Sequence, residues 1–195
     1  PDGKGRPVAK YFSNARNCHY IGVHLTKNIL AHAVADAEGN ILSADRDEFP
    51  PEGETKLRTV NRILSVIEKS VGALPEGKKM CGVGVAVSRW LRPPLSNFDL
   101  GSDLPEIIAR ATGLPVFSGL PISVLLFREL ALFPERRDVM LVHPGMVLEL
   151  GLVRDGAIPA DADALEKSFS HVCVDEKGVE CYCGKRGCLE NYATL

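Results

Sequence analysis

The stretch Met80-Cys-Gly-Val-Gly-Val-Ala-Val87 is an uninterrupted apolar run of strand length. Runs without alternation of apolar and polar residues are typical of parallel strands that are covered on both faces. Parallel neighbours require a crossover connection, which is usually a helix. A helix is predicted just upstream, over 52–74, because apolar residues recur there at helical spacing. Its expected apolar face comprises Leu57, Val60, Ile63, Leu64, Ile67 and Val71.

Three further strand-like runs, rich in Ile, Val and Leu, come before this helix at 20–25, 28–34 and 41–49. The turn-forming sequence Asp36-Ala-Glu-Gly-Asn40 separates the last two runs. This spacing predicts an antiparallel meander at the start of the fold.

Another helix and strand are predicted after the apolar run. Helical spacing over 104–112 ends at Gly113, where a left-handed cap residue is favoured, and a short buried strand follows over 114–118. The complete order is therefore βββαβαβ, which indicates one α/β lobe.

The strand pattern then starts again. A helical stretch over 122–132 leads to strand-like runs at 138–143 and 146–153, with a turn at Asp155-Gly156. We expect a second lobe that is only partly contained in the chain. The expected organisation is a linker over 1–19, a first lobe over 20–120 and a partial second lobe over 121–195 that carries a cysteine-rich loop.

Composition limits what this chain can be. With 195 residues, 45% hydrophobic and 25% charged, it can bury one sizeable core or two small lobes. No apolar run approaches the roughly 20 residues that span a bilayer, and no signal segment is visible, so a cytoplasmic protein without membrane partners is expected. A formal net charge of −2 gives no electrostatic footprint for binding a nucleic-acid duplex.

The first sixteen residues differ from the rest in charge. They contain four basic residues and one acidic residue, together with Gly3, Gly5 and Pro7. The chain also begins with Pro1 and not with a methionine. We therefore expect a fragment in which 1–19 leads in from an upstream domain.

Four residues near the carboxyl end have the chemistry of a metal site. Three thiolates and one imidazole form a closed tetrahedral set suited to zinc. Gly184 and Gly187 fit this interpretation, because a loop that folds around one ion must bend sharply and glycine adopts positive φ without strain. The predicted ligands are His171, Cys181, Cys183 and Cys188.

Alternatives for these cysteines stay open. In a reducing cytoplasm they could simply pack as thiols, whereas redox chemistry is disfavoured because a Cys-x-Cys disulfide would be strained. A zinc finger that reads DNA would need a recognition helix after the ligands. Cys173 lies two residues beyond His171 and could compete as a ligand, but it is left out of the site because a lone cysteine is more often a small packed thiol.

The segment Gly178–Glu190, with His171 before it, resembles the zinc signature of the ROK family of sugar-responsive repressors and sugar kinases. Ile21-Gly-Val23, with Asp36 and Gly39 downstream, is similar to the family's opening hairpin, and Gly113-Leu-Pro-Val-Phe117 to the strand before its catalytic segment. The resemblance spans about 20–195. It implies an actin-like, ribonuclease-H-like fold of two lobes with a sugar cleft between them, and an upstream winged helix in the repressors.

Against the kinases of this family, three motifs are replaced. The position of Asp-x-Gly-Gly-Thr holds His24-Leu-Thr-Lys-Asn28, and the position of Glu-Asn-Asp holds Gly119-Leu-Pro121. The second phosphate loop, Gly-x-Gly-x-Gly, corresponds to Gly145, Val147 and Glu149. Phosphoryl transfer needs a carboxylate base and glycine-rich turns at the phosphates, so no catalytic residue and no ATP cofactor are expected.

The sugar contacts implied by the resemblance are also altered. Ser168 stands where the family has a glutamate, and His171 could contact an effector through the ring nitrogen that does not bind zinc. The sequence is therefore interpreted as the inert effector-binding and dimerisation domain of a ROK-type regulator with structural zinc. Its expected partners are a sugar-like effector, a second copy in a homodimer, and operator DNA through the upstream domain. An active sugar kinase and a ligand-free scaffold are the alternatives.

Overall fold

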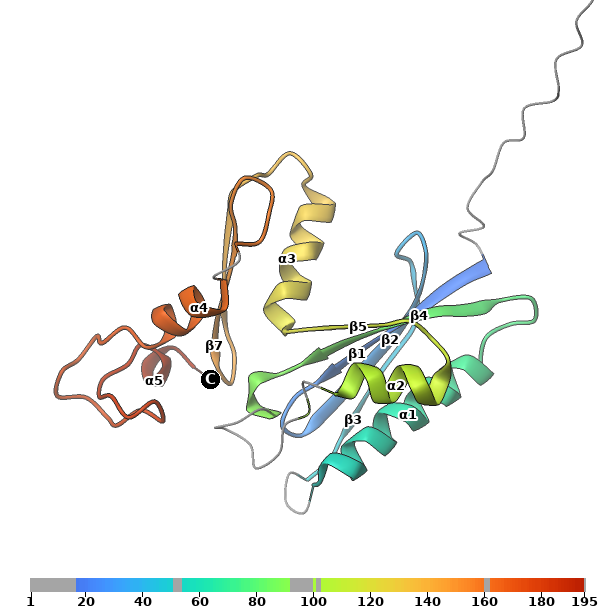
Figure 1. Cartoon of the computed structure of the whole chain (residues 1–195), viewed down its shortest axis with the longest axis horizontal. Coiled ribbons are helices and arrows are strands. Elements are labelled where there is room, and N and C mark those ends of the chain that lie inside the picture. Colours follow the sequence, from blue (N-terminus) through green and yellow to red (C-terminus); the bar gives the residue numbers. More distant parts are fainter. Residues whose placement is uncertain (1–16, 51–53, 92–99, 101–102, 160–161, 195) are drawn as a thin grey trace, which may run out of the picture.

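A computed structural model describes residues 17–50, 54–91, 100, 103–159 and 162–194, without the side chains of 163, 164 and 166. Its larger sheet has five strands in the order β3-β2-β1-β4-β5 (Figure 1). β1, β2 and β3 are antiparallel neighbours, while β4 runs parallel to both β1 and β5. The βββαβαβ order expected from the sequence is observed. The strands are β1 Cys18–Leu25, β2 Ile29–Asp36, β3 Ile41–Glu48, β4 Lys79–Val87 and β5 Val116–Gly119.

Two helices, α1 (Lys56–Gly72) and α2 (Leu104–Thr112), cover one face of this sheet (Figure 1). Thr55 caps α1, because its side chain accepts a hydrogen bond from the Arg58 N–H at 3.3 Å. Gly113 ends α2 in the left-handed conformation, with φ 69°, as predicted. The core between helices and sheet includes Ile21, Val23, Leu25, Ile63, Ile67, Val83, Val85, Val87, Leu104 and Ile108.

The predicted apolar face of α1 was partly wrong. Leu57 is 69% exposed and Val71 is 43% exposed, whereas Val66 and Thr59 are buried. Thr59 can be buried because its hydroxyl donates hydrogen bonds to Thr55 O and to the Glu54 carboxylate, at 3.0 and 3.1 Å. The buried stripe is therefore rotated toward Thr59 and Val66.

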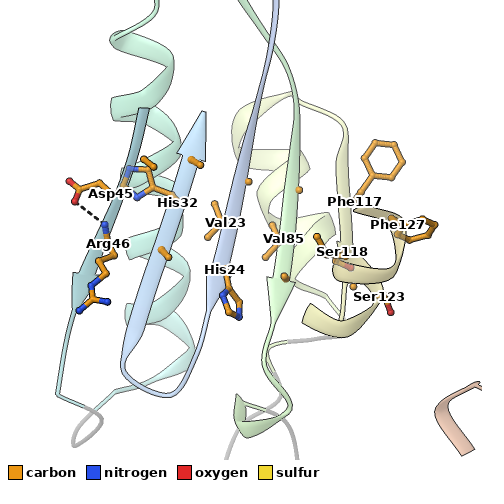
Figure 2. Close-up of a pocket in the computed structure, with 18 of the residues that line it drawn as sticks. Val23, His24, His32, Asp45, Arg46, Val85, Phe117, Ser118, Ser123 and Phe127 are labelled. Carbon is orange, nitrogen blue, oxygen red and sulfur yellow. Dashed lines mark hydrogen bonds between the residues drawn. The ribbon is translucent and has the colours of Figure 1, made fainter. Parts of the chain in front are cut away.

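The other face of the sheet is open over its central strands. Gly84 of β4 is exposed, so the expected cover on both faces of this strand is incomplete in the part of the chain that the structure describes. Small residues of four strands form the floor of a pocket of about 1010 Å³ on this face, and Phe117 and Phe127 stand at its edge (Figure 2). The floor residues include Gly22, Ala31, Ala33, Ala44, Gly84 and Ala86.

The second half of the chain starts with α3 (Pro121–Leu132), which begins two residues after β5 ends. The hairpin of β6 (Val139–Pro144) and β7 (Leu148–Val153) follows as a separate two-stranded sheet. Two helices that the sequence did not predict come next, α4 (Ala162–Ser170) and the short α5 (Glu190–Ala193). The cysteine-rich loop lies between them (Figure 1).

The expected linker over 1–19 falls mostly outside the described residues, which begin at 17. Of its last residues, Cys18 and His19 already belong to β1. Among the described helices, none is both long and apolar enough to cross a bilayer.

Candidate functional site

Four side chains converge in the loop between α4 and α5. The ligand atoms of His171, Cys181, Cys183 and Cys188 all lie within 4.8 Å of one another. His171 Nδ1 is 3.6 Å from Cys181 Sγ, and Cys183 Sγ is 3.6 Å from Cys188 Sγ. Two thiolates at about 2.3 Å from a tetrahedral zinc ion would stand about 3.8 Å apart, so the separation of Cys183 and Cys188 fits a single ion. The structure thus brings together all four predicted ligands in a group that can hold a metal ion.

The backbone of the loop explains this convergence. Cys181 N–H donates to Lys185 O at 2.8 Å and Gly184 N–H to Cys181 O at 2.9 Å, so the chain reverses tightly over 181–185, with Cys183 inside the turn. Gly184 has φ 85° and Gly187 has φ 64°, as the sequence led us to expect for a sharply bent loop.

Cys173 is exposed and lies outside the four-residue group. Its backbone forms an isolated antiparallel bridge with Cys188. The residue therefore aligns the loop through its main chain, and its thiol is not one of the four converging ligand atoms.

Proton equilibria in the loop depend on burial and on neighbouring thiols. Burial, followed by the nearby thiols of Cys183 and Cys181, raises the pKa of Cys188 to about 12. Burial also tends to raise the pKa of Cys183, but the Lys185 N–H and the adjacent thiols outweigh it and lower that pKa. Desolvation by burial lowers the pKa of His171, which favours the neutral imidazole that a metal requires. A bound cation would displace the remaining thiol protons.

A second polar centre, which we call the carboxylate cluster, comprises Glu149, Glu190, His143 and Arg89. Glu149 of β7 is 3% exposed, and its Oε2 lies 3.1 Å from His143 Nδ1. Its other oxygen, Oε1, is buried and forms no hydrogen bond within the described residues. Glu190 of α5 is also buried, and its Oε1 accepts a hydrogen bond from the Leu148 N–H at 3.3 Å.

Burial raises the pKa of both Glu149 and Glu190. Arg89, in the short 3-10 helix Arg89–Leu91 after β4, opposes this rise at both carboxyl groups. It also lowers the pKa of His171 electrostatically, although burial has the larger effect. A residue of the first half of the chain therefore acts electrostatically on both polar centres of the second half.

The cysteine-rich loop, which lies between α4 and α5, is next to the carboxylate cluster. The rings of His171 and Tyr182 meet edge to face, with centroids 5.1 Å apart. The pKa of Tyr182 is raised, mainly by burial and next by the charge of Glu190. Glu190 itself follows Cys188 by two residues, so a metal ion that fixes the loop would also fix this carboxylate.

The residues at the replaced kinase positions lie on three different elements, and His143 acts on two of them, His24 and Glu149. His24 is the last residue but one of β1 and lines the pocket of Figure 2, and loss of surrounding water, with a smaller effect of His143, lowers its pKa. Pro121 is the first residue of α3, with Leu120 as its extended N-cap. Glu149 is directly paired with His143 in the β6–β7 ladder.

Ser168 and Ser170 differ in burial. Ser168, the predicted effector contact, is exposed on α4. Ser170 is fully buried, and its hydroxyl lowers the pKa of Glu190 through a hydrogen bond, against the larger effect of burial. Sequence reasoning missed Arg89, Ser170 and Glu190. The available signal was that Glu190 is the last residue of the segment that resembles the zinc signature; nothing in the sequence pointed to Arg89.

Comparisons with known proteins identify relatives of two kinds. The chain is 22% identical to the DNA-binding transcriptional repressor Mlc of Escherichia coli K12, over 98% of the chain and 50% of that protein. It is 25% identical to the glucokinase of Streptomyces coelicolor A3(2), over 89% of the chain and 56% of that protein. A xylose repressor of Bacillus spizizenii is 21% identical over 98% of the chain. The chain spans about half the length of the curated relatives it matches. No family model matches it.

Solved structures show the same fold. A ROK family transcriptional regulator, a homologue of the E. coli Mlc protein, superposes with a TM-score of 0.76 at 21% identity, over 93% of this chain and 48% of that one. A ROK family glucokinase from Streptomyces griseus, in complex with glucose and AMPPNP, gives 0.65 at 24% identity, over 90% and 57%. The mixed α/β fold with its five-stranded sheet is thus shared with regulators and sugar kinases alike.

Proposed function

We propose, from the premise that this chain is a homologue of ROK-family repressors and sugar kinases, that it is the effector-binding and dimerisation part of a transcriptional regulator. In this proposal the chain transfers no phosphate. It binds a sugar or sugar derivative, and this binding changes the arrangement of an upstream DNA-binding domain.

The observation that carries the proposal is the environment of Glu149. The resemblance aligns this residue with a glycine of the kinase phosphate loop, where backbone amides approach the nucleotide. Here the segment is a β-strand paired with β6, and it carries a buried carboxyl group. A carboxylate beside a phosphate is repulsive in a site of low dielectric constant. Glu149 therefore argues against nucleotide binding at this position.

Two further replacements support an inert chain. Pro121 occupies the last position of the kinase Glu-Asn-Asp segment, and proline has no side-chain group that accepts a proton. His24 replaces the acid of the first phosphate motif, and its lowered pKa favours the neutral form, which cannot hold Mg²⁺ as a carboxylate does.

We infer that the metal ion is zinc, because three thiols and one imidazole, here within 4.8 Å of one another, form a ligand set that zinc prefers. When bound, zinc would supply folding energy to the loop and no chemistry in the effector site. His171, Cys181, Cys183 and Cys188 would hold it, and the loop would then present Tyr182 and Glu190 at fixed positions.

An effector with several hydroxyl groups fits the carboxylate cluster. Glu149 offers a buried oxygen that forms no hydrogen bond within the described residues, and Arg89 offers a cation to the same region. Hydrogen bonds to charged groups discriminate strongly between ligands that have a hydroxyl and ligands that lack it. His171 and Ser168 are the additional contacts that the sequence suggests.

Coupling to DNA would follow from where Arg89 lies. This residue belongs to the first half of the chain and acts electrostatically on groups of the second half. A ligand that neutralises or displaces these carboxylates would favour one arrangement of the halves over another, and allostery requires such a difference in binding between states. In a homodimer this change would alter the spacing of two upstream DNA-binding domains.

The test is an assay of the full-length protein with ATP, Mg²⁺ and a panel of hexoses, amino sugars and their derivatives. Phosphorylation coupled to ADP release would overturn the proposal and establish the kinase, which the similarity to glucokinases keeps as the second candidate. We expect no turnover, together with a rise in melting temperature for at least one sugar. No turnover and no stabilised sugar complex would leave a ligand-free scaffold.

A further inference from the structure

Cys173 lies directly opposite Cys188, where two segments of the cysteine-rich loop run antiparallel. Two backbone hydrogen bonds of 2.8 Å flank the pair, Val174 N–H to Gly187 O and Leu189 N–H to Val172 O. Bonds from the residues on either side, and not from the cysteines themselves, define a non-hydrogen-bonded pair of an antiparallel ladder. The register of the two cysteines is therefore fixed from both sides.

The backbone of this pair suits a disulfide. The Cα atoms of a non-hydrogen-bonded pair stand about 4.5 Å apart, and the two side chains point to the same face of the ladder. Disulfides join Cα atoms that are about 4.4 to 6.8 Å apart. The pair of Cys173 and Cys188 falls within this range, near its lower end, and rotation about the Cα–Cβ bonds can bring the two sulfurs together.

The two thiols differ in exposure and in their relation to the metal site. Cys188 is 0% exposed, and its Sγ lies 3.6 Å from Cys183 Sγ in the group of four candidate ligands. Cys173 is exposed and lies outside that group. Once a metal ion holds the three ligand thiolates, Cys173 is the loop cysteine that is both uncoordinated and open to an oxidant from solvent.

We propose that Cys173 is an oxidation site that withdraws Cys188 from the metal site. Hydrogen peroxide oxidises Cys173, Cys188 closes a disulfide with it, and the loop releases its metal ion, because the ligand of a metal is a thiolate and three ligands remain of four. This switch rests on the zinc site of the proposed function and adds a regulation to it. Oxidation would free Tyr182 and Glu190 from the positions that the metal-loaded loop gives them.

The reaction has two steps. The Cys173 sulfur attacks one oxygen of hydrogen peroxide, so that an S–O bond forms, the O–O bond breaks, and water leaves a sulfenic acid on Cys173. The Cys188 thiolate then attacks the Cys173 sulfur, an S–S bond forms, and the S–O bond breaks; the departing hydroxide takes a proton from solvent. The two cysteines lose two electrons, and one peroxide is reduced to two molecules of water.

The experiment treats the zinc-loaded full chain with increasing amounts of hydrogen peroxide. A coloured chelator reports released zinc, and alkylation followed by trypsin and mass spectrometry identifies the links. Trypsin separates Cys173, in peptide 168–177, from Cys181 and Cys183, in 178–185, and from Cys188, in 187–195. We expect peptide 168–177 linked to 187–195, with about one zinc released for each link formed. Dithiothreitol and added zinc should restore the metal content.

Matched variants separate the switch from direct attack on the ligands. Cys173→Ser should load zinc as the unmodified chain does and should retain it at the peroxide dose that empties the unmodified chain. Cys81→Ser is the control, because Cys81 is another partly accessible cysteine outside the metal group. This variant should form the link and release zinc like the unmodified chain.

Three results would overturn the switch. These are a link that joins 178–185 to 187–195 in place of the expected one, equal zinc release from Cys173→Ser, and the expected link without loss of zinc. A reduced chain that takes up no zinc would refute the metal assignment itself. That failure is visible before any peroxide is added, so it cannot be confused with failure of the switch.

Discussion

The carbonyl oxygen of Asp175 lies 1.6 Å from the point where a Cβ atom on residue 187 would stand, and only glycine at that position avoids the clash. Gly187 also has φ 64°. We expect Gly187→Ala to prevent the cysteine-rich loop from closing, with loss of bound metal. Metal content and the unfolding midpoint measure the effect.

Gly184→Ala is the matched control. Gly184 has φ 85°, but a Cβ atom there would meet nothing within 4 Å. The free energy of unfolding of this variant should fall by only about 1–2 kcal/mol, the cost of a left-handed backbone for alanine, and the variant should retain its metal. Equal metal loss in both variants would contradict the steric explanation.

Removal of metal should unfold the loop. Chelation of the metal-loaded protein, or Cys188→Ser, should lower the melting temperature markedly, because a structural zinc site contributes directly to folding. Cys173→Ser should retain about one zinc per chain by elemental analysis, because its thiol lies outside the group. Full stability of the metal-free chain would refute the structural role.

Metal affinity should fall as the pH falls. Burial and the adjacent thiols raise the pKa of Cys188 to about 12, so an incoming cation must displace its proton. Calorimetric titration in two buffers with different ionisation enthalpies would measure the protons released. A binding enthalpy independent of the buffer would contradict this prediction.

Glu149→Gln should stabilise the protein at neutral pH. Burial raises the pKa of Glu149 above its ordinary 4.5, so between 4.5 and the raised value the folded state holds a proton that the unfolded state has released. The free energy of unfolding therefore falls as the pH rises through this window, and stays reduced above it. Glutamine cannot ionise, so the gain should be present at pH 7 and vanish below the window.

Urea denaturation of Glu149→Gln at a series of pH values would measure this dependence. Glu76→Gln is the control, because Glu76 is exposed and should change stability little at any pH. An equal gain for Glu149→Gln on both sides of the window would show that ionisation is not its cause.

Ile63→Ala and Leu57→Ala should differ in stability, because Ile63 lies on the buried face of α1 and Leu57 on its exposed face. Ile63 is fully buried, so its truncation should cost about 2–5 kcal/mol. Leu57 is 69% exposed, and its truncation should change stability by no more than about 0.5 kcal/mol. Similar costs from chemical denaturation would mean that α1 packs on the face expected from the sequence alone.

Local rules predicted most elements of the five-stranded sheet and of the helices that cover it. β1, β2, β4 and α2 were predicted because each combines apolar residues with a clear boundary, such as Gly113 after α2. β3 was also predicted, although all eight of its residues are exposed and only its first two are large and apolar. The face of α1 was harder, because apolar residues occupy more than one side and the buried Thr59 gives no hydrophobic signal. α4 was missed because its nine residues include few large apolar side chains, although the apolar residues it has stand at helical spacing.

The cysteine-rich loop and the carboxylate cluster differ in how far the sequence predicts them. The four candidate metal ligands lie within eighteen positions, and glycines mark the bends, so their spacing predicted that they would converge. The carboxylate cluster joins Arg89, Glu149 and Glu190, which are separated by dozens of residues and meet only because the sheet, the hairpin and α5 place them together. No local sequence pattern predicts that residues so far apart in the chain will lie close together.

The fluorescence of the single tryptophan can report ligand binding near Arg89. Trp90 is the chain's single tryptophan, adjacent in sequence to Arg89, and the Lys27 ammonium lies 5.2 Å from the centre of its ring. Indole emission responds to nearby charge and to solvent access, so any molecule that engages the arginine should change the intensity or colour of that single signal. Occupancy could then be followed in real time without attaching a dye.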